Sequence, residues 1–320
     1  MLQWRSNNSM GGVARSWCYL RLPSLVVLAA VAFQLNVATV AALGLEGAGT
    51  INPGIGSTQL FGAKGLWFDA FREAIIVANT EANRVFVLNR QGAVSKILGD
   101  RQNLPLPVAV ASDGDATLFI ALRDSETIKV LRQYDSGTGE EYTDLNLSEY
   151  RVKSAVQPVA LFMDQDGNLH VADRGNRQII VLDKRLSLKL QIPNVGEPSD
   201  VWVVAGRIYV ADPGFGGIRE YDGNGRMLRT LGTMPGQYHE PLRVKALAID
   251  RNGRLWLLEE ANRGIKAIDA NGNLLARFGS AQLGGLELFN IADLAIDREN
   301  NLYVLEEGTN RIAVFRIRDF

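Results

Sequence analysis

The feature that most constrains this chain is a short segment that recurs six times. Each copy contains an apolar strand, a turn, a second strand, a polar loop and a third strand, and often a fourth strand. Equivalent positions are 43, 51, 39, 47 and 47 residues apart, and they are Ala78, Ala121, Ala172, Ala211, Leu258 and Leu305. Periods of about 40–50 residues are typical of one four-stranded propeller blade. The repeat therefore predicts an all-β fold, a six-bladed β-propeller with four-stranded antiparallel blades.

The turns between the predicted strands contain the residues that tight hairpins require. Asn-Gly and Asp-Gly pairs tolerate the positive φ of such turns. The turn residues are Gln91-Gly92, Asp166-Gly167, Asn224-Gly225, Asn252-Gly253, Asn271-Gly272 and Asn300. The apolar runs before the first turn of each copy are predicted to be the inner strands, buried between blades. They are Gly65–Asp69, Val108–Ser112, Val159–Asp164, Asp200–Val204, Ala246–Asp250 and Ala292–Asp297.

The last copy ends after its third strand, at the end of the chain, and lacks a fourth. The segment GSTQLFG at 56–62 resembles LLARFG at 274–279, which is a predicted outer strand. We therefore expect residues 57–62 to supply the missing outer strand, so that an N-terminal strand closes the ring and leaves no unpaired edge. In this interpretation residues 44–56 are a linker and residues 57–320 form the propeller.

The N-terminal segment has the pattern of a secretory signal peptide. Residues 1–43 contain three arginines and no acidic residue, with an apolar core at 25–33 and small residues near Ala41 and Ala42. Cleavage after either alanine fits this pattern. The alternative is an uncleaved membrane anchor at residues 22–45, which carry no charge. Both readings predict an extracytoplasmic propeller, secreted or periplasmic, which contacts a membrane only through an uncleaved N-terminal segment.

Charge and cysteine content narrow the possible partners and cofactors. Beyond residue 43 the chain carries a net charge of about −4, so the composition gives no basic footprint for nucleic acid. Cys18 is the only cysteine and precedes the apolar run. The remaining chain is therefore predicted to have no disulfide and no thiolate metal site.

The repeat resembles a known family. The segments VADRGNRQIIVLD at 171–183 and GTMPGQYHEPLRVKALAID at 232–250 look like NHL repeats. So do four Asn-Arg pairs: Asn83-Arg84, Asn176-Arg177, Asn262-Arg263 and Asn310-Arg311. The resemblance covers residues 57–320, although copies two and four lack the pair. It implies a six-bladed propeller of a family whose members mostly bind proteins, RNA or carbohydrates. A minority of similar propellers are metal-dependent lyases or calcium lactonases, and fold alone does not choose among these functions.

The loops between second and third strands are expected to share the face at the channel mouth. They place Arg123 and Arg174 in a basic sector of blades two and three. The glutamates form an acidic sector of blades five and six, and they are Glu259, Glu260, Glu306 and Glu307. Such a face can bind a polar ligand, or a cation near the glutamates. The alternative is that these charges are solvated or stabilise neighbouring blades.

The two histidines, His170 and His239, are too few for a catalytic zinc site, which typically has three protein ligands. His239 and the adjacent Tyr238 lie in an accessible loop and remain candidates for ligand binding. A calcium site would need carboxylates that converge on the channel. The starts of the inner strands instead predict a polar ring without a carboxylate, made of Gln157, Ser199, Lys245 and Asn290. We therefore expect no metal and no cofactor.

Two insertions, 132–156 and 280–290, interrupt the regular spacing and are candidate docking loops. Together these features favour an exported, monomeric, non-enzymatic NHL-type propeller. Its loop face would bind a protein, a peptide or a glycan. The alternative is a gluconolactonase-type hydrolase with a calcium ion in the channel.

Overall fold

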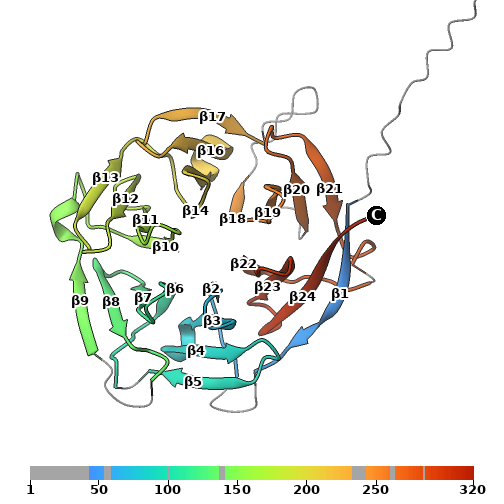
Figure 1. Cartoon of the computed structure of the whole chain (residues 1–320), viewed down its shortest axis with the longest axis horizontal. Coiled ribbons are helices and arrows are strands. Elements are labelled where there is room, and N and C mark those ends of the chain that lie inside the picture. Colours follow the sequence, from blue (N-terminus) through green and yellow to red (C-terminus); the bar gives the residue numbers. More distant parts are fainter. Residues whose placement is uncertain are drawn as a thin grey trace, which may run out of the picture. The chain divides into compact units, whose positions relative to one another are not determined.

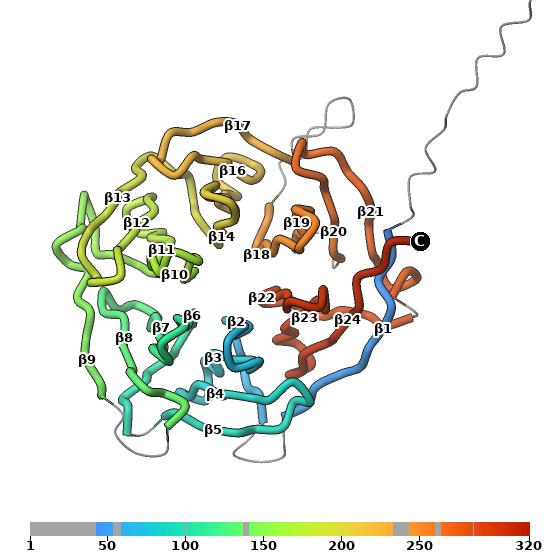
Figure 2. The backbone as a smooth tube through the Cα atoms, in the orientation of Figure 1, coloured from blue at the N-terminus to red at the C-terminus, as the bar shows by residue number. Residues whose placement is uncertain are grey.

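Six four-stranded antiparallel sheets surround one central axis in the computed structural model of this protein (Figure 1). The structure describes residues 43–53, 59–99, 101–136, 141–232, 243–259, 264–283 and 285–320. Each sheet runs from the channel to the periphery, as the backbone trace in Figure 2 shows. The expected six-bladed propeller is therefore confirmed.

Blades one to five follow chain order from the channel outwards. Blade one has β2 (Gly65–Asp69), β3 (Ala74–Asn79), β4 (Arg84–Asn89) and β5 (Val94–Leu98). Blade two has β6 (Pro107–Ser112), β7 (Leu118–Leu122), β8 (Thr127–Arg132) and β9 (Glu141–Asn146). Blade three has β10 (Pro158–Met163), β11 (Leu169–Asp173), β12 (Gln178–Leu182) and β13 (Leu188–Ile192).

The remaining blades complete the ring, and the sixth takes its outer strand from the other end of the chain. Blade four has β14 (Asp200–Val204), β15 (Arg207–Asp212), β16 (Gly217–Asp222) and β17 (Met227–Leu231). Blade five has β18 (Val244–Ile249), β19 (Leu255–Glu259), β20 (Ile265–Ile268) and β21 (Leu274–Phe278). Blade six has β22 (Ile291–Ile296), β23 (Asn301–Glu306), β24 (Arg311–Asp319) and β1 (Leu43–Ile51).

The inner strands agree with their predicted ranges to within two residues at each end. The predicted hairpin turns are also present, with a residue at positive φ in each. These residues are Gly92, Gly167, Gly225, Gly253, Gly272 and Asn300. Aspartates at the turns add hydrogen bonds: Asp164 Oδ1, for example, accepts from the backbone N–H groups of Asp166 at 2.9 Å and Asn168 at 2.8 Å. Local turn chemistry thus sets the register of the blades.

The predicted closing strand was wrong in its position. The outer strand of blade six is β1, which pairs with β24 from Leu43 opposite Asp319 to Ile51 opposite Ile312. This strand lies within the segment that the sequence suggested to be a linker. The resemblance of 56–62 to an outer strand was misleading, because Leu60 is fully buried and the Phe61 N–H donates to Asn79 Oδ1 of blade one at 2.6 Å. Residues 59–62 therefore lead into the inner strand of blade one.

The apolar core of the described residues lies between the blades. Its buried side chains form six clusters, each at one junction of adjacent blades. The junction of blades six and one contains Ile51 of β1 together with Leu66, Phe86 and Leu305. Because each blade is covered on both faces by its neighbours, closure of the ring completes the burial of the first and last blades.

The described parts of the two insertions pack into this scaffold. Tyr134 is 1% exposed and its hydroxyl donates to Asp69 Oδ2 at 2.5 Å, and Tyr150 is also buried. The first insertion supplies β9, the outer strand of blade two. In the second, Leu283 and Leu288 are buried at the junction of blades five and six. Neither insertion is a simple projecting loop over its described residues.

The predicted signal peptide, residues 1–43, lies outside the described residues except for Leu43, and the alternative anchor, residues 22–45, is described only at residues 43–45, which begin β1. Among the described residues, no helix is long and apolar enough to cross a membrane.

We predict that stability depends on β1. A chain that begins at residue 53 should melt roughly 10 °C or more below a chain that begins at residue 43. The shorter chain loses the edge pairing of β24 and the burial of Ile51, and such losses cost several kcal/mol. Thermal unfolding followed by circular dichroism measures the difference. Equal melting temperatures for the two chains would show that β1 does not close the ring.

Candidate functional site

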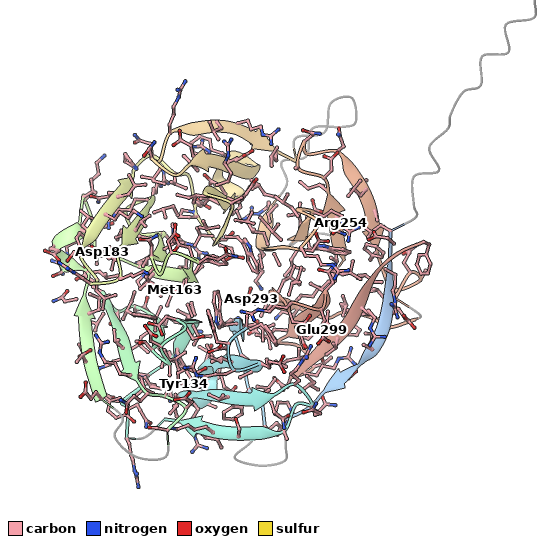
Figure 3. All side chains as sticks on the ribbon, viewed as in Figure 1. Tyr134, Met163, Asp183, Arg254, Asp293 and Glu299 are labelled. Carbon is pink, nitrogen blue, oxygen red and sulfur yellow. The ribbon has the colours of Figure 1, made fainter. Side chains whose placement is uncertain are left out.

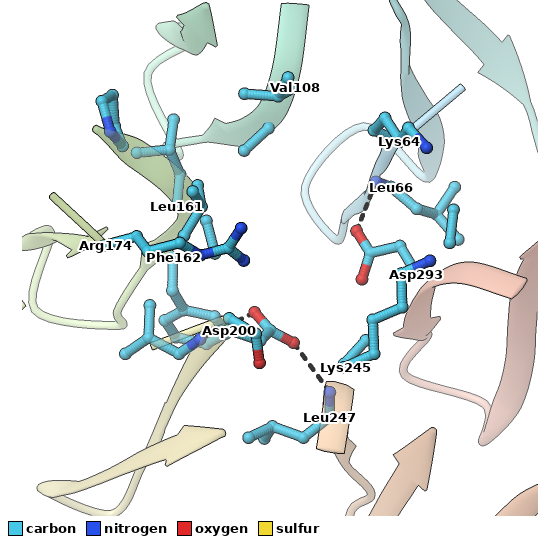
Figure 4. Close-up of a pocket in the computed structure, with 18 of the residues that line it drawn as sticks. Lys64, Leu66, Val108, Leu161, Phe162, Arg174, Asp200, Lys245, Leu247 and Asp293 are labelled. Atoms are coloured by element: carbon cyan, nitrogen blue, oxygen red, sulfur yellow. Dashed lines mark hydrogen bonds between the residues drawn. The ribbon is translucent and has the colours of Figure 1, made fainter. Parts of the chain in front are cut away.

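A cavity of about 530 Å³ opens at the centre of the ring, and the inner strands of all six blades line it (Figure 4). These strands are β2, β6, β10, β14, β18 and β22. We call this cavity the cup. Its volume lies within the range of roughly 300–1,000 Å³ that small-molecule sites occupy.

Four of the six inner strands begin with a bulge in their pairing with the second strand. Pairing with the second strand shifts by one residue after Pro107, Pro158, Val244 and Ile291, in blades two, three, five and six. A bulge of this kind leaves one extra residue and re-aims its side chain. In blade five the extra residue is Lys245, whose Nζ donates to the Ile291 carbonyl of blade six at 2.8 Å.

Two carboxyl groups of the inner strands line the cup, contrary to the predicted polar ring without a carboxylate. The register makes Asp200 and Asp293 equivalent to small residues of the other four blades, which are Gly65, Ala109, Ala160 and Ala246. Asp293 lay inside a predicted apolar strand, where an isolated aspartate gave no signal. An alignment of the six inner strands by their pairing could have identified Asp293, because only two of the six copies have an acidic residue at its position.

Three of the four residues of the predicted polar ring line the cup, and the fourth is not part of its lining. Gln157, Ser199 and Lys245 line the cup. Asn290 instead donates through Nδ2 to Glu307 Oε2 at 3.0 Å. The polar ring is therefore present in part, with the two aspartates added to it.

Each channel aspartate joins two neighbouring blades. Asp200 of blade four accepts the Leu247 N–H of blade five at 2.8 Å, and Asp293 of blade six accepts the Leu66 N–H of blade one at 2.7 Å (Figure 4). The second oxygen of each accepts the N–H of the following residue, at 2.8 Å in both cases. A carboxylate has about four acceptor positions, so lone pairs of both groups remain available to the cup.

The environment of this pair favours the protonated state. Burial raises the pKa of Asp293 to about 7, while its two backbone hydrogen bonds and the charge of Lys245 oppose the rise. Burial and the charge of Asp293 raise the pKa of Asp200 well above its ordinary value. Two carboxylates in one poorly solvated site repel each other, so the pair retains a proton to higher pH than ordinary aspartates do. In Figure 3, Asp293 lies near the centre of the ring, whereas Asp183 lies at its edge.

Three aromatic rings form the floor of the cup. These rings belong to Trp67, Phe162 and Trp202. Each lies on an inner strand, two residues after Gly65, Ala160 or Asp200 of the same strand. The Trp67 and Phe162 ring centroids are 5.4 Å apart in an edge-to-face arrangement, and those of Phe162 and Trp202 are 4.9 Å apart. Contacts of this geometry stabilise a rigid apolar surface. We call these three residues the aromatic floor.

The mouth of the cup carries positive side chains, including both arginines predicted for the basic sector. Arg123 lines the mouth and donates through Nη2 to Glu81 Oε1 at 3.2 Å. Arg174 lines the cup from the loop between β11 and β12. Lys64 also lines the mouth and pairs with Glu307 Oε2 at 2.5 Å.

The predicted acidic sector does not form a cluster of free carboxylates. Glu306 is 1% exposed and accepts from Arg311 Nε at 2.7 Å, across the pairing of β23 and β24. Glu259 is buried and forms an ion pair with Lys266 of the adjacent strand. Neither lines the cup. The physical reason is cross-strand pairing, which provides each glutamate with a cation inside its own blade. Tyr238, His239 and Glu260 lie outside the described residues.

His170 is part of the scaffold. It is buried, and its Nε2 lies 2.9 Å from Asp164 Oδ2 at the turn of the same blade. Trp256 and Tyr303 make the equivalent contacts in blades five and six, to Asp250 Oδ2 at 3.0 Å and Asp297 Oδ2 at 3.1 Å. Because three different side chains make the same contact in three blades, the contact has a structural role within the blade. No group of three or more His, Cys, Asp or Glu side chains suited to a metal ion occurs among the described residues.

No protein-family model matches the chain, and no curated protein sequence matches it either. Solved structures with a similar fold include enzymes and a WD40 propeller domain. The chain is similar to a catalytically inactive virginiamycin B lyase from Staphylococcus aureus with quinupristin, at 11% identity and a TM-score of 0.60, covering 82% of each chain.

A gluconolactonase from Xanthomonas campestris has 14% identity and a TM-score of 0.61, covering 88% of this chain and 99% of the other. The WD40 propeller domain of Doa1 has 14% identity and a TM-score of 0.56, covering 85% and 96%. Identities of 11–14% show that this chain shares the propeller fold with these proteins, and they do not assign it a function.

We predict that the Asp293 carboxyl makes stability pH-dependent. Its pKa of about 7 in the folded protein exceeds the ordinary value, so its contribution is complete at low pH and is lost as pH rises towards 7. Between the ordinary pKa of an aspartate and pH 7, the titration of Asp293 should lower the free energy of unfolding by up to about 1.4 kcal/mol per pH unit. Asp293→Asn should reduce the slope, as urea unfolding between pH 4.5 and 8 would measure.

Asp269→Asn is the matched control, because burial raises the pKa of Asp269 but hydrogen bonds from Asn273 and the turn backbone outweigh it and lower that pKa below its ordinary value. That variant should lose stability and keep the wild-type slope above pH 5. An Asp293→Asn slope equal to that of the wild type would mean that the channel carboxyl is ionised throughout.

Proposed function

We propose that this protein is an exported, monomeric, non-enzymatic propeller of the NHL type, and that the cup is its ligand site. A protein, peptide or glycan partner would approach the loop face and insert one terminal residue or one sugar ring into the cup. The observation that carries this proposal is the combination of a 530 Å³ cavity, an aromatic floor and polar groups at the wall and mouth. Concave sites with an apolar base and a few placed polar groups are typical of ligand recognition.

Rigid anchoring of the lining residues supports binding. Trp67 Nε1 donates to Ser112 Oγ at 2.9 Å, and Ser112 Oγ in turn donates to the buried Asp69 at 2.8 Å. The channel aspartates are held by the backbone of two blades each. A preformed site loses little conformational entropy when a ligand binds.

The Asn-Arg pairs support the NHL assignment through structural roles. The Asn83 side chain accepts the Leu106 N–H of the next blade at 2.8 Å, and Asn176 Oδ1 accepts the Lys153 N–H at 2.9 Å. Arg311 donates to the Glu287 carbonyl at 3.1 Å. Asn83, Asn176 and Arg311 thus each bind the backbone of a segment that connects two blades, whereas Asn262 and Arg263 lie outside the described residues.

A calcium-dependent, gluconolactonase-type hydrolase is the second candidate, and the two channel carboxyls favour it. Calcium prefers six to eight oxygen ligands, commonly several carboxylates. Here both oxygens of Asp200 and Asp293 already accept backbone N–H groups, and the Lys245 ammonium is close enough to Asp293 to oppose the rise in its pKa. This competition makes binding without a metal the better-supported function.

We predict that compounds entering the cup will perturb Trp67 and Trp202. Trp256 is a suitable internal control because it is fully buried at the junction of blades five and six. A screen of sugars, short peptides, organic acids and amines, followed by NMR of ¹⁵N-labelled indoles assigned with Trp→Phe variants, would detect binding. Ligands should shift the two floor indoles and leave Trp256 unchanged.

A cup-filling variant gives the matched test. Ala160→Phe should abolish these shifts, because its side chain would occupy the cup wall. The control Ala270→Phe, at an exposed turn, should leave them unchanged. If ligands bind equally to the Ala160→Phe variant, or if no compound perturbs the floor indoles, the cup is not the ligand site.

Calcium separates the two candidate functions. We predict that 5 mM calcium or a chelator changes the melting temperature of the purified protein by no more than about 1 °C, since a ligand stabilises only the state that binds it. A stabilisation of several degrees that disappears in Asp200→Asn, accompanied by lactone hydrolysis, would establish the hydrolase instead.

A further inference from the structure

We propose that the cup selects ligands that carry a carboxylate, which the guanidinium of Arg174 receives while a ring-shaped body of the ligand rests on the aromatic floor. This inference rests on the proposed function, because it names the ligand class for the same site.

The loop that carries Arg174 is rigid. The Arg174 N–H donates to the Gln157 carbonyl at 3.0 Å. The preceding residue, Asp173, is fully buried and accepts from the Gln157 N–H at 2.8 Å and from Gln178 Nε2 at 2.8 Å. The base of the arginine side chain is therefore held in place before any ligand arrives.

The guanidinium extends from this loop into the cup (Figure 4). It makes no hydrogen bond or ion pair with any described residue, although three aspartates, Asp124, Asp200 and Asp293, line the same cavity. A planar fork of N–H donors that has no partner within the protein suits a carboxylate, which accepts two parallel hydrogen bonds.

The other cations of the cup have partners. Lys64 pairs with Glu307, and Arg123 pairs with Glu81. Lys245 donates to the Ile291 carbonyl, and Arg243 also has an interaction partner. Among the described cations of the lining, the charge of Arg174 is the one without a partner.

The acidic groups do not offset this charge. Asp200 and Asp293 belong to the blades on either side of Lys245, and burial raises the pKa of both carboxyl groups, which reduces their negative charge near neutral pH. Asp124 and Glu197 also belong to the lining, and they are exposed, as Arg174 is. Five cations and four carboxyl groups line the cup in all, so the lining has a surplus positive charge, which favours an anionic ligand.

The shape of the cup limits the body of the ligand. The aromatic floor offers ring faces and edges from three blades, and the cavity volume of about 530 Å³ admits one sugar or aromatic ring with its substituents. A ring with a carboxylate satisfies both the floor and the guanidinium. An amine of the same shape would place its charge beside Arg174 and Lys245 and be repelled.

Benzoate, benzamide and benzylamine test this selectivity, since they share a ring and differ in charge. Titrations into the full chain, followed through the indole signals of Trp67 and Trp202, measure the three affinities. We expect benzoate to bind about tenfold or more tightly than benzamide, and benzylamine to bind most weakly. Tighter binding of benzylamine would overturn the proposal and assign selectivity to the aspartates.

Variants of the loop connect selectivity to one side chain. Arg174→Gln should reduce benzoate affinity about tenfold and leave benzamide affinity unchanged, and Arg174→Lys should give an intermediate loss because it keeps the charge without the fork. Arg177→Gln is the matched control, since this exposed arginine of the same loop does not line the cup. Equal benzoate binding by the wild type and Arg174→Gln would contradict the proposal.

The outcomes distinguish this inference from the proposed function. If screened compounds perturb the floor indoles but benzoate binds no better than benzamide, the cup is a ligand site and the carboxylate assignment is wrong. If neither benzoate nor any screened compound perturbs these indoles, both proposals fail together.

Discussion

The pairing of β1 with β24 is the interaction on which the rest of the structure depends. It joins the two ends of the described chain over the length of a nine-residue strand. In a propeller, each blade buries both faces against its neighbours, so an open ring would expose apolar surface at two blades. Closure also brings the six inner strands around one axis. Together with the contacts between blades six and one, such as the Leu66 N–H bond to Asp293, this pairing keeps closed the ring that forms the cup.

The repeated residues of the chain mainly build the scaffold. Aspartates at the hairpin turns order the backbone and bind the aromatic side chain or histidine six residues later, as with Asp250 and Trp256. Glu259 of blade five and Glu306 of blade six pair with cations of adjacent strands. The features of the cup differ in kind, because Asp200, Asp293 and Arg174 occur where individual copies depart from the repeat. In this propeller, the departures from the repeat are the better guide to function.

The sequence predicted the number of blades, the inner strands and the hairpin turns, because these depend on local periodicity and turn chemistry. It misplaced the closing strand, since the pairing of β1 joins residues some 270 positions apart and leaves no local signal beyond short apolar similarity. Arg174 and Glu306 were both predicted from the sequence as site residues, but only Arg174 lines the cup. The partner of Glu306, Arg311, becomes evident only from strand pairing. Asp293 was missed because a single acid in an apolar run has no periodicity.

A crystal structure of the protein isolated from the cells that produce it would test the central claim most directly. That claim is that the ligand occupies the cup at the centre of the ring. We predict electron density for a bound molecule above Trp67 and Trp202, with a carboxylate facing Arg174. A co-purified ligand bound at the outer edges of the blades, with the cup occupied only by solvent, would contradict the account.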